Sequence, residues 1–105
     1  MTQAMETVYQ TILARKSADP KTSYVAKLLA KGHTHIAKKL GEEAVETAIA
    51  SAQNDRSEVI YESADLLFHL SVLWAAHDIT PEEVFAELAR REGTSGIEEK
   101  ASRTE

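Results

Sequence analysis

The feature that most constrains the fold is a pair of long helical segments separated by only two residues, Asn54 and Asp55. Residues 34–53 and 56–77 are rich in residues that favour helix, and neither segment shows the alternation expected of a strand. At about 1.5 Å per residue, each helix would be about 30 Å long. With a connection this short, the second helix must pack beside the first and run in the opposite direction. The sequence therefore predicts an all-α fold built on an antiparallel helical hairpin.

Shorter helical segments flank this hairpin. Together with the hairpin they are expected to form a four-helix-bundle-like core. Residues 4–16 place their apolar side chains on one face. The segment 23–32 begins with a serine that can cap a helix and ends with a glycine that can stop one. Residues 80–92 begin with Thr-Pro-Glu-Glu, a strong helix start. We expect one domain over residues 1–105, with a polar tail from about residue 94.

Charge and composition exclude several classes of protein. The net charge of -5 argues against a nucleic-acid binder, which would present a basic face. The absence of cysteine excludes disulfides and thiolate metal sites. The N-terminal residues do not resemble a secretory signal, and the longest apolar stretch, near 66–76, is interrupted by His69 and Ser71. We therefore expect a cytoplasmic protein with neither a nucleic acid nor a membrane as its partner.

Five carboxylates stand out on the two long helices: Glu42, Glu43 and Glu46 on the first, and Glu62 and Asp65 on the second. Residues three positions apart on a helix lie about 60° apart on one face, so each helix presents a short acidic stripe. Glu46 and Glu62 are about equally far from the turn, which puts them at the same height in the hairpin. Glu43 then lies near Asp65. The pattern predicts four facing carboxylates.

Such a cluster of oxygen ligands suits a hard divalent cation, Mg²⁺ or Mn²⁺. Residues 56–77 are apolar almost all round the helix axis, which predicts a buried helix. Carboxylates on a buried helix need a compensating cation. The competing interpretation is two acidic faces open to water, since Glu is common on helices. His69, one turn beyond Asp65, could hydrogen-bond to a metal ligand or could be a buried structural histidine.

The same apolar circumference predicts association between chains. A chain of 105 residues has too few other helices to cover residues 56–77 on every side. Symmetric pairing is the commonest way to bury such a surface. We therefore expect a homodimer whose partner helices complete the bundle.

The acidic pattern also resembles a known family. Glu42-Glu43-x-x-Glu46, fifteen residues and then Glu62-x-x-Asp65 resemble the E-E-x-x-E…E-x-x-D motif of the all-α nucleotide pyrophosphohydrolases, the MazG-like superfamily. Within it, four segments resemble the phosphoribosyl-ATP pyrophosphatase family of histidine biosynthesis: SYVAKLL (23–29), KKLGEEA (38–44), ADLLFHL (64–70) and EKASR (99–103). The resemblance runs from about residue 7 to residue 103. Phe68 and Ser63 depart from it, where the family often has Tyr and Ala.

The resemblance implies a reaction, a cofactor and an assembly. The reaction is hydrolysis of phosphoribosyl-ATP to phosphoribosyl-AMP and pyrophosphate, with Mg²⁺ as cofactor and a homodimer as the assembly. The implied metal ligands are Glu43, Glu46, Glu62 and Asp65. Glu42 would orient or deprotonate the attacking water, although it could equally be a further ligand or a solvated neighbour.

Basic residues would contact the phosphates of the nucleotide. The candidates are Lys27, Lys38, Lys39, Lys100 and Arg103. Lys38 and Lys39 lie one turn before the acids, where they could instead pair with Glu42 or Glu43. Lys27, Lys100 and Arg103 are candidates mainly because of the family resemblance.

Three other functions fit parts of the sequence. A general nucleoside-triphosphate pyrophosphatase would use the same carboxylates without selecting the phosphoribosyl group. A di-iron bundle protein would use Glu-x-x-His pairs, whereas this sequence has Asp65 and His69 four residues apart and no second histidine in register. A non-catalytic helical interaction module would not need a matched acidic cluster.

Overall fold

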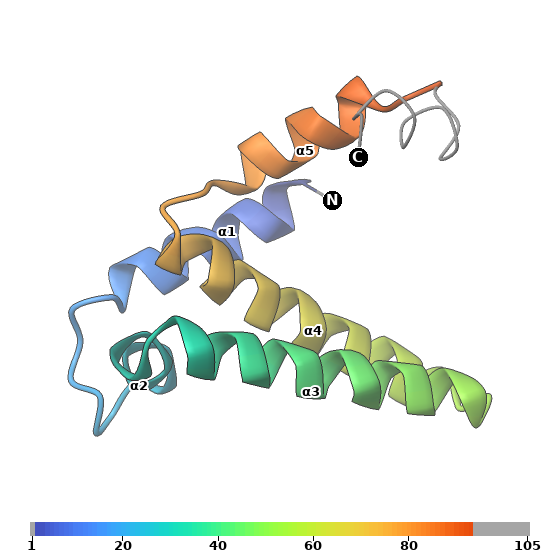
Figure 1. Ribbon diagram of the computed structural model, residues 1–105, viewed down its shortest axis with the longest axis horizontal. Helices are drawn as coiled ribbons and strands as arrows, with labels where there is room; N and C mark the ends of the chain where they lie inside the picture. Colours follow the sequence, from blue (N-terminus) through green and yellow to red (C-terminus); the bar gives the residue numbers. More distant parts are fainter. Residues whose placement is uncertain (1, 94–105) are drawn as a thin grey trace.

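Residues 2–93, the part of the chain that the computed structural model describes, form five helices (Figure 1). They are α1 (Thr2–Ala14), α2 (Tyr24–Lys31), α3 (His33–Ala52), α4 (Arg56–Ala76) and α5 (Pro81–Arg90). The all-α prediction is confirmed. Helices α3 and α4 lie side by side and run in opposite directions, which confirms the helical hairpin. Helices α1, α2 and α5 gather around one end of it (Figure 1).

The hairpin turn is closed by local backbone chemistry. Asn54 adopts a left-handed conformation with φ of 55°, which asparagine tolerates better than most residues. The next residue, Asp55, caps α4, because its carboxylate accepts a hydrogen bond from the amide of Glu58 at 3.2 Å. The amide of Asp55 donates back to the carbonyl of Ala50 at 3.2 Å. These bonds fix where α4 begins, and so fix its register against α3.

Helix α2 is short and has a defined start and end. The hydroxyl of Ser23 accepts a hydrogen bond from the amide of Ala26 at 3.2 Å, as expected of a cap. At the other end, Gly32 has φ of 90°, a conformation that side chains rarely allow. The chain turns there and enters α3 at His33. The position of α2 against the start of α3 therefore depends on this glycine.

The hydrophobic core lies at one end of the hairpin, where α1 and α2 pack on the C-terminal half of α4. Its buried members are Tyr9, Ile12, Val25, Leu28, Ile36, Val72, Trp74 and Ala75. Helix α5 packs along α1, and its Phe85 meets Trp74 edge to face with ring centres 6.5 Å apart. This core anchors one end of the hairpin. The polar residues lie farther along the same two helices.

The other half of the hairpin is open in the single chain, as expected of a chain with too few helices to cover α4 on every side. Four aliphatic side chains of α3 and α4 are about half exposed, and we call them the open face: Val45, Ile49, Ile60 and Leu67. The reason is a shortage of helices, because α1, α2 and α5 are all used at the core end. The open face is unusually apolar for a surface in water.

Helix α4 as a whole is also long and apolar enough to cross a membrane, judged by length and composition alone. The apolar stretch near residues 66–76 is only the C-terminal part of this helix. A single helix of this kind is weak evidence for a membrane span, and α4 carries Glu62 and Asp65 in its middle and packs on α1 and α3.

Replacing Thr80 with alanine is expected to lower the free energy of unfolding by about 1 kcal/mol. Thr80 and Glu83 form a complete capping box at the start of α5. The Thr80 hydroxyl accepts from the Glu83 amide at 3.2 Å, and the Glu83 carboxylate accepts from the Thr80 amide at 2.9 Å. Urea unfolding measures the loss. Thr80→Ser keeps the hydroxyl and should stay close to the parent, so an equal loss in both variants would contradict the assignment.

Candidate metal centre

The acidic cluster lies in the middle of the hairpin, between α3 and α4. Glu43, Glu46 and Glu62 each bring a carboxylate oxygen to within 4.8 Å of the other two. Thr47 ties the two helices together here, since its hydroxyl lies 2.8 Å from the carbonyl oxygen of Glu43 and 3.3 Å from that of Glu62. The structure thus brings these acids together at the height that the sequence register predicts.

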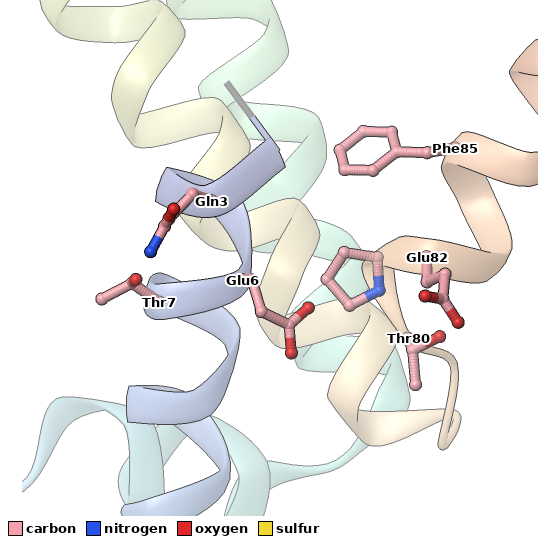
Figure 2. A pocket seen from close by; sticks show the side chains of 7 residues that line it. Gln3, Glu6, Thr7, Thr80, Glu82 and Phe85 are labelled. Carbon is pink, nitrogen blue, oxygen red and sulfur yellow. The ribbon is translucent and has the colours of Figure 1, made fainter.

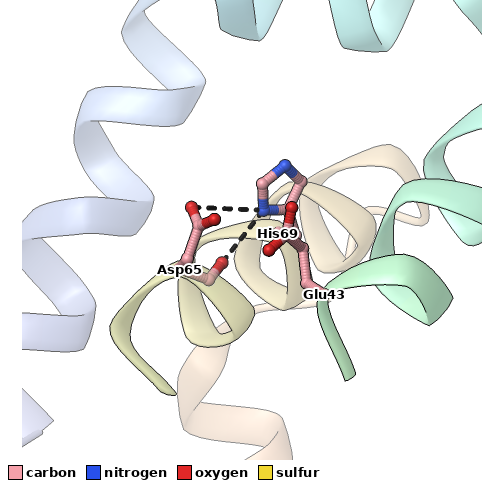
Figure 3. Close-up of side chains that lie close together, drawn as sticks. All are labelled: Glu43, Asp65 and His69. Carbon is pink, nitrogen blue, oxygen red and sulfur yellow. Dashed lines mark hydrogen bonds and ion pairs between the residues drawn. The ribbon is translucent and has the colours of Figure 1, made fainter. Parts of the chain in front are cut away.

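Glu43 is the centre of the cluster. It belongs to the group with Glu46 and Glu62, and also to a second group with Asp65 and His69, whose ligand atoms again lie within 4.8 Å of one another (Figure 3). Its side chain is buried, with 7% of the residue exposed, whereas Glu46 is exposed and Glu62 and Asp65 are intermediate. Glu43 therefore connects all four acids that the sequence predicts as metal ligands.

The cluster is short of positive charge. Burial, together with the nearby Asp65 and Glu46, raises the pKa of Glu43 to about 8. Burial and then the charge of Glu46 also raise the pKa of Glu62. Within residues 2–93, one buried oxygen of Glu43 and one of Glu62 have no hydrogen-bond partner. Buried carboxylate oxygens without partners are costly unless a cation compensates them. An all-oxygen donor set with free oxygens fits a hard divalent cation.

His69 is buried, with 4% exposed, and both of its ring nitrogens have partners. Nδ1 lies 2.9 Å from the backbone carbonyl oxygen of Asp65 and 3.7 Å from its carboxylate. A carbonyl oxygen can only accept, so Nδ1 carries the proton and donates (Figure 3). Nε2 lies 3.1 Å from the hydroxyl of Tyr24. Nδ1 carries a proton and so has no lone pair for a metal, and Nε2 faces the Tyr24 hydroxyl. Both ring nitrogens are thus engaged within the protein, which favours a role beside Asp65 over metal ligation.

Glu42 lies beside the cluster and is exposed. Its carboxylate is 3.6 Å from the ammonium nitrogen of Lys39, so the lysine pairs with Glu42 three residues away. Tyr24 first, and then Glu42, raise the pKa of Lys39. Lys38 is exposed on the same helix. Of the two neighbouring lysines, Lys39 is therefore the one that lies against the acidic residues.

The other basic candidates lie on α2 or beyond the described part of the chain. Lys27 is exposed on α2 and lines a hollow of about 520 Å³ whose wall includes Lys21 and Tyr24. Lys100 and Arg103 lie outside the described residues. Tyr24, which the sequence pattern does not single out as a site residue, is half exposed at the start of α2 and still reaches His69. Its sequence signals are its place directly after the capping Ser23 and its position within the segment 23–29 that carries the family resemblance.

A larger hollow, of about 600 Å³, lies elsewhere on the described chain, between α1 and the start of α5 (Figure 2). It is lined by Gln3, Glu6, Thr7, Thr80, Pro81, Glu82 and Phe85. These side chains include two carboxylates and no lysine or arginine. A hollow with that charge is poorly suited to a phosphorylated ligand. The acidic cluster on the hairpin remains the better candidate site.

Comparison with known proteins agrees with this geometry. Residues 5–92 match the family model described as phosphoribosyl-ATP pyrophosphohydrolase. The chain is 58% identical to the phosphoribosyl-ATP pyrophosphatase of Rhizorhabdus wittichii, over 98% of this chain and 97% of that protein. It is 55% identical to the protein of the same name from Rhodobacter capsulatus, over 95% and 97%. For that of Novosphingobium aromaticivorans the identity is 61%, over 90% and 88%. The chain belongs to the phosphoribosyl-ATP pyrophosphohydrolase family.

Proposed function

We propose that this chain hydrolyses phosphoribosyl-ATP to phosphoribosyl-AMP and pyrophosphate, the second step of histidine biosynthesis, with Mg²⁺ as its cofactor. The observation that carries the proposal is the buried carboxylate of Glu43, with an unpartnered oxygen at the centre of four acids. Family membership supports the choice of substrate, since the three relatives described above are phosphoribosyl-ATP pyrophosphatases. A nucleotide substrate is consistent with a cytoplasmic location.

Four residues would hold the cation: Glu43, Glu46, Glu62 and Asp65. Mn²⁺ has similar ligand preferences and could replace Mg²⁺. When bound, the divalent cation neutralises charge on the phosphate oxygens. The protein's own part is to fix the carboxylates in place. Thr47 would do this by linking the two helices, and His69 by keeping Nδ1 at 3.7 Å from the Asp65 carboxylate.

The remaining residues would position water and phosphate. Water adds to one phosphorus of the α–β linkage, the bond from that phosphorus to the bridging oxygen breaks, and phosphoribosyl-AMP and pyrophosphate separate. Glu42 is exposed beside the cluster and would orient the water and accept its proton. Lys39, whose ammonium nitrogen is 3.6 Å from the Glu42 carboxylate, would contact a phosphate there. Lys38 and Lys27 are exposed and available for other phosphate oxygens. Lys100 and Arg103 stay candidates from the sequence alone.

The activity is tested directly with purified protein. We expect pyrophosphate release from phosphoribosyl-ATP with Mg²⁺, little release in EDTA, and much slower release from ATP. Comparable rates on ATP and phosphoribosyl-ATP would instead indicate a general nucleoside-triphosphate pyrophosphatase. Release from neither nucleotide would indicate a non-catalytic helical module.

The proposal includes a homodimer, supported by the open face. A symmetric partner would bury Val45, Ile49, Ile60 and Leu67, which are about half exposed in the single chain. The open face flanks the acidic cluster on the same two helices, so pairing would also exclude water near the carboxylates.

Light scattering is expected to give twice the chain mass of 11.6 kDa at micromolar concentration. Ile60→Glu should shift this to the monomer, because it places charge in an apolar contact. Leu88→Glu is a matched control on α5, since Leu88 is 59% exposed and Ile60 is 58% exposed. A parent protein that is already monomeric, or two variants that dissociate equally, would contradict the open face as the interface.

A further inference from the structure

Tyr24 is the first residue of α2, yet its side chain reaches a residue in the middle of α4. Its hydroxyl oxygen lies 3.1 Å from Nε2 of His69, which is 45 positions away in the sequence. Half of Tyr24 is exposed, whereas His69 is 4% exposed. The hydroxyl is therefore the end of the side chain that meets the buried interior. Through this hydrogen bond, α2 contacts His69, which lies beside Glu43 and Asp65.

The direction of this hydrogen bond follows from the other ring nitrogen. Nδ1 of His69 donates to the backbone carbonyl of Asp65 at 2.9 Å. In a neutral imidazole the second nitrogen then has a lone pair and no proton. The Tyr24 hydroxyl must therefore donate to Nε2. Donation there favours the form of the ring that keeps its proton on Nδ1, facing Asp65. A continuous chain of donors runs from Tyr24 through His69 to the main-chain carbonyl of Asp65, and the Asp65 carboxylate lies 3.7 Å from the same Nδ1.

Phe68 packs against two of these side chains, the rings of Tyr24 and His69. It stacks nearly parallel to Tyr24, with ring centres 6.3 Å apart and planes 19° apart. It also meets the ring of His69 at 89°, with centres 5.3 Å apart. The His69 ring is thus fixed by Phe68, by the Tyr24 hydroxyl and by the Asp65 carbonyl. The packing of Phe68 supplies no hydrogen bond, so the Tyr24 hydroxyl is still needed as the donor to Nε2.

We propose that Tyr24 is a positioning residue for the cation-binding carboxylates, acting on Asp65 through His69. The proposal rests on the function proposed above, in which Asp65 is one of the ligands. A partner that orients a metal ligand typically changes metal affinity or activity by about 10- to 100-fold when it is removed. Tyr24 therefore contributes to Mg²⁺ binding from a helix that supplies none of the four acids.

Tyr24→Phe tests this with the loss of one oxygen atom, since it keeps the ring that stacks on Phe68. We expect about tenfold weaker Mg²⁺ binding by titration calorimetry and about tenfold lower kcat at limiting Mg²⁺. KM for phosphoribosyl-ATP at saturating Mg²⁺ should stay close to that of the parent, and so should the melting temperature. Tyr61→Phe is the matched control, because it removes the hydroxyl of an exposed tyrosine on a different helix, α4.

A double-mutant cycle tests whether Tyr24 acts through His69. In His69→Asn the amide can still donate to the Asp65 carbonyl but presents nothing at the position of Nε2. This variant should match Tyr24→Phe, and the double variant should show no further loss. Additive losses in the double variant would overturn the proposal, as would a rise confined to KM, which would mean direct contact with the substrate.

The outcomes also separate this inference from the proposed function. A parent protein that binds Mg²⁺ but releases no pyrophosphate contradicts the function, and the calorimetric comparison still decides the role of Tyr24. An active parent with unchanged Mg²⁺ affinity in Tyr24→Phe overturns the inference alone. A parent that binds no Mg²⁺ overturns both.

Discussion

Replacing Glu43 with glutamine is expected to lower pyrophosphate release by about a thousandfold or more. A bound cation contributes several kcal/mol to a phosphoryl-transfer transition state, and each 1.36 kcal/mol corresponds to about a factor of ten in rate. Glu43 connects the group with Glu46 and Glu62 to the group with Asp65. Its loss should therefore affect the whole centre. Steady-state rates across a Mg²⁺ titration measure the effect.

The same variant should be more stable than the parent without metal. The buried carboxylate of Glu43 is crowded by Asp65 and Glu46, whereas a glutamine amide has almost the same shape and no charge. Thermal melting in EDTA at pH 8 should show a higher midpoint for Glu43→Gln. Glu82→Gln, at an exposed position in the first turn of α5, is the control. An active Glu43→Gln protein, or one less stable than the parent in EDTA, would remove Glu43 from the centre.

The metal-free protein is expected to lose stability as the pH rises from about 5 to about 8. The pKa of Glu43 is raised from 4.5 to about 8 in the folded chain, so the folded state holds a proton that the unfolded state releases. This stabilising contribution is fully present below about pH 4.5 and is lost as the pH rises through about 8. The raised pKa of Glu62 acts in the same direction. Urea unfolding in EDTA across this range measures the slope.

Mg²⁺ should reverse that loss, because it replaces the proton as the compensating charge. At about 100 times its Kd it adds about 2.7 kcal/mol to the free energy of unfolding. For a domain of this size, that corresponds to an increase of about 10 °C or more in Tm. Asp65→Asn should lose most of this increase. A flat pH profile in EDTA, or an equal Mg²⁺ effect at pH 5 and pH 8, would contradict the crowded-carboxylate model.

The sequence by itself determined the helical hairpin and the register of its acids. Both follow from local quantities, namely the helical period and a turn of two residues, so Glu43, Glu46, Glu62 and Asp65 could be placed together before any packing was known. The caps at Ser23, Asp55 and Thr80 were equally readable, because a capping side chain bonds to an amide only three residues away.

The tertiary structure alone decided how the surroundings of those acids differ. Whether Glu43 is buried while Glu46 is exposed depends on how far apart α3 and α4 lie, and spacing along one helix does not set that distance. The bond between Tyr24 and His69 joins residues 45 positions apart, and it depends on where the turn at Gly32 sends α2. Local propensity predicts the helices, but the packing of apolar side chains decides which polar groups meet.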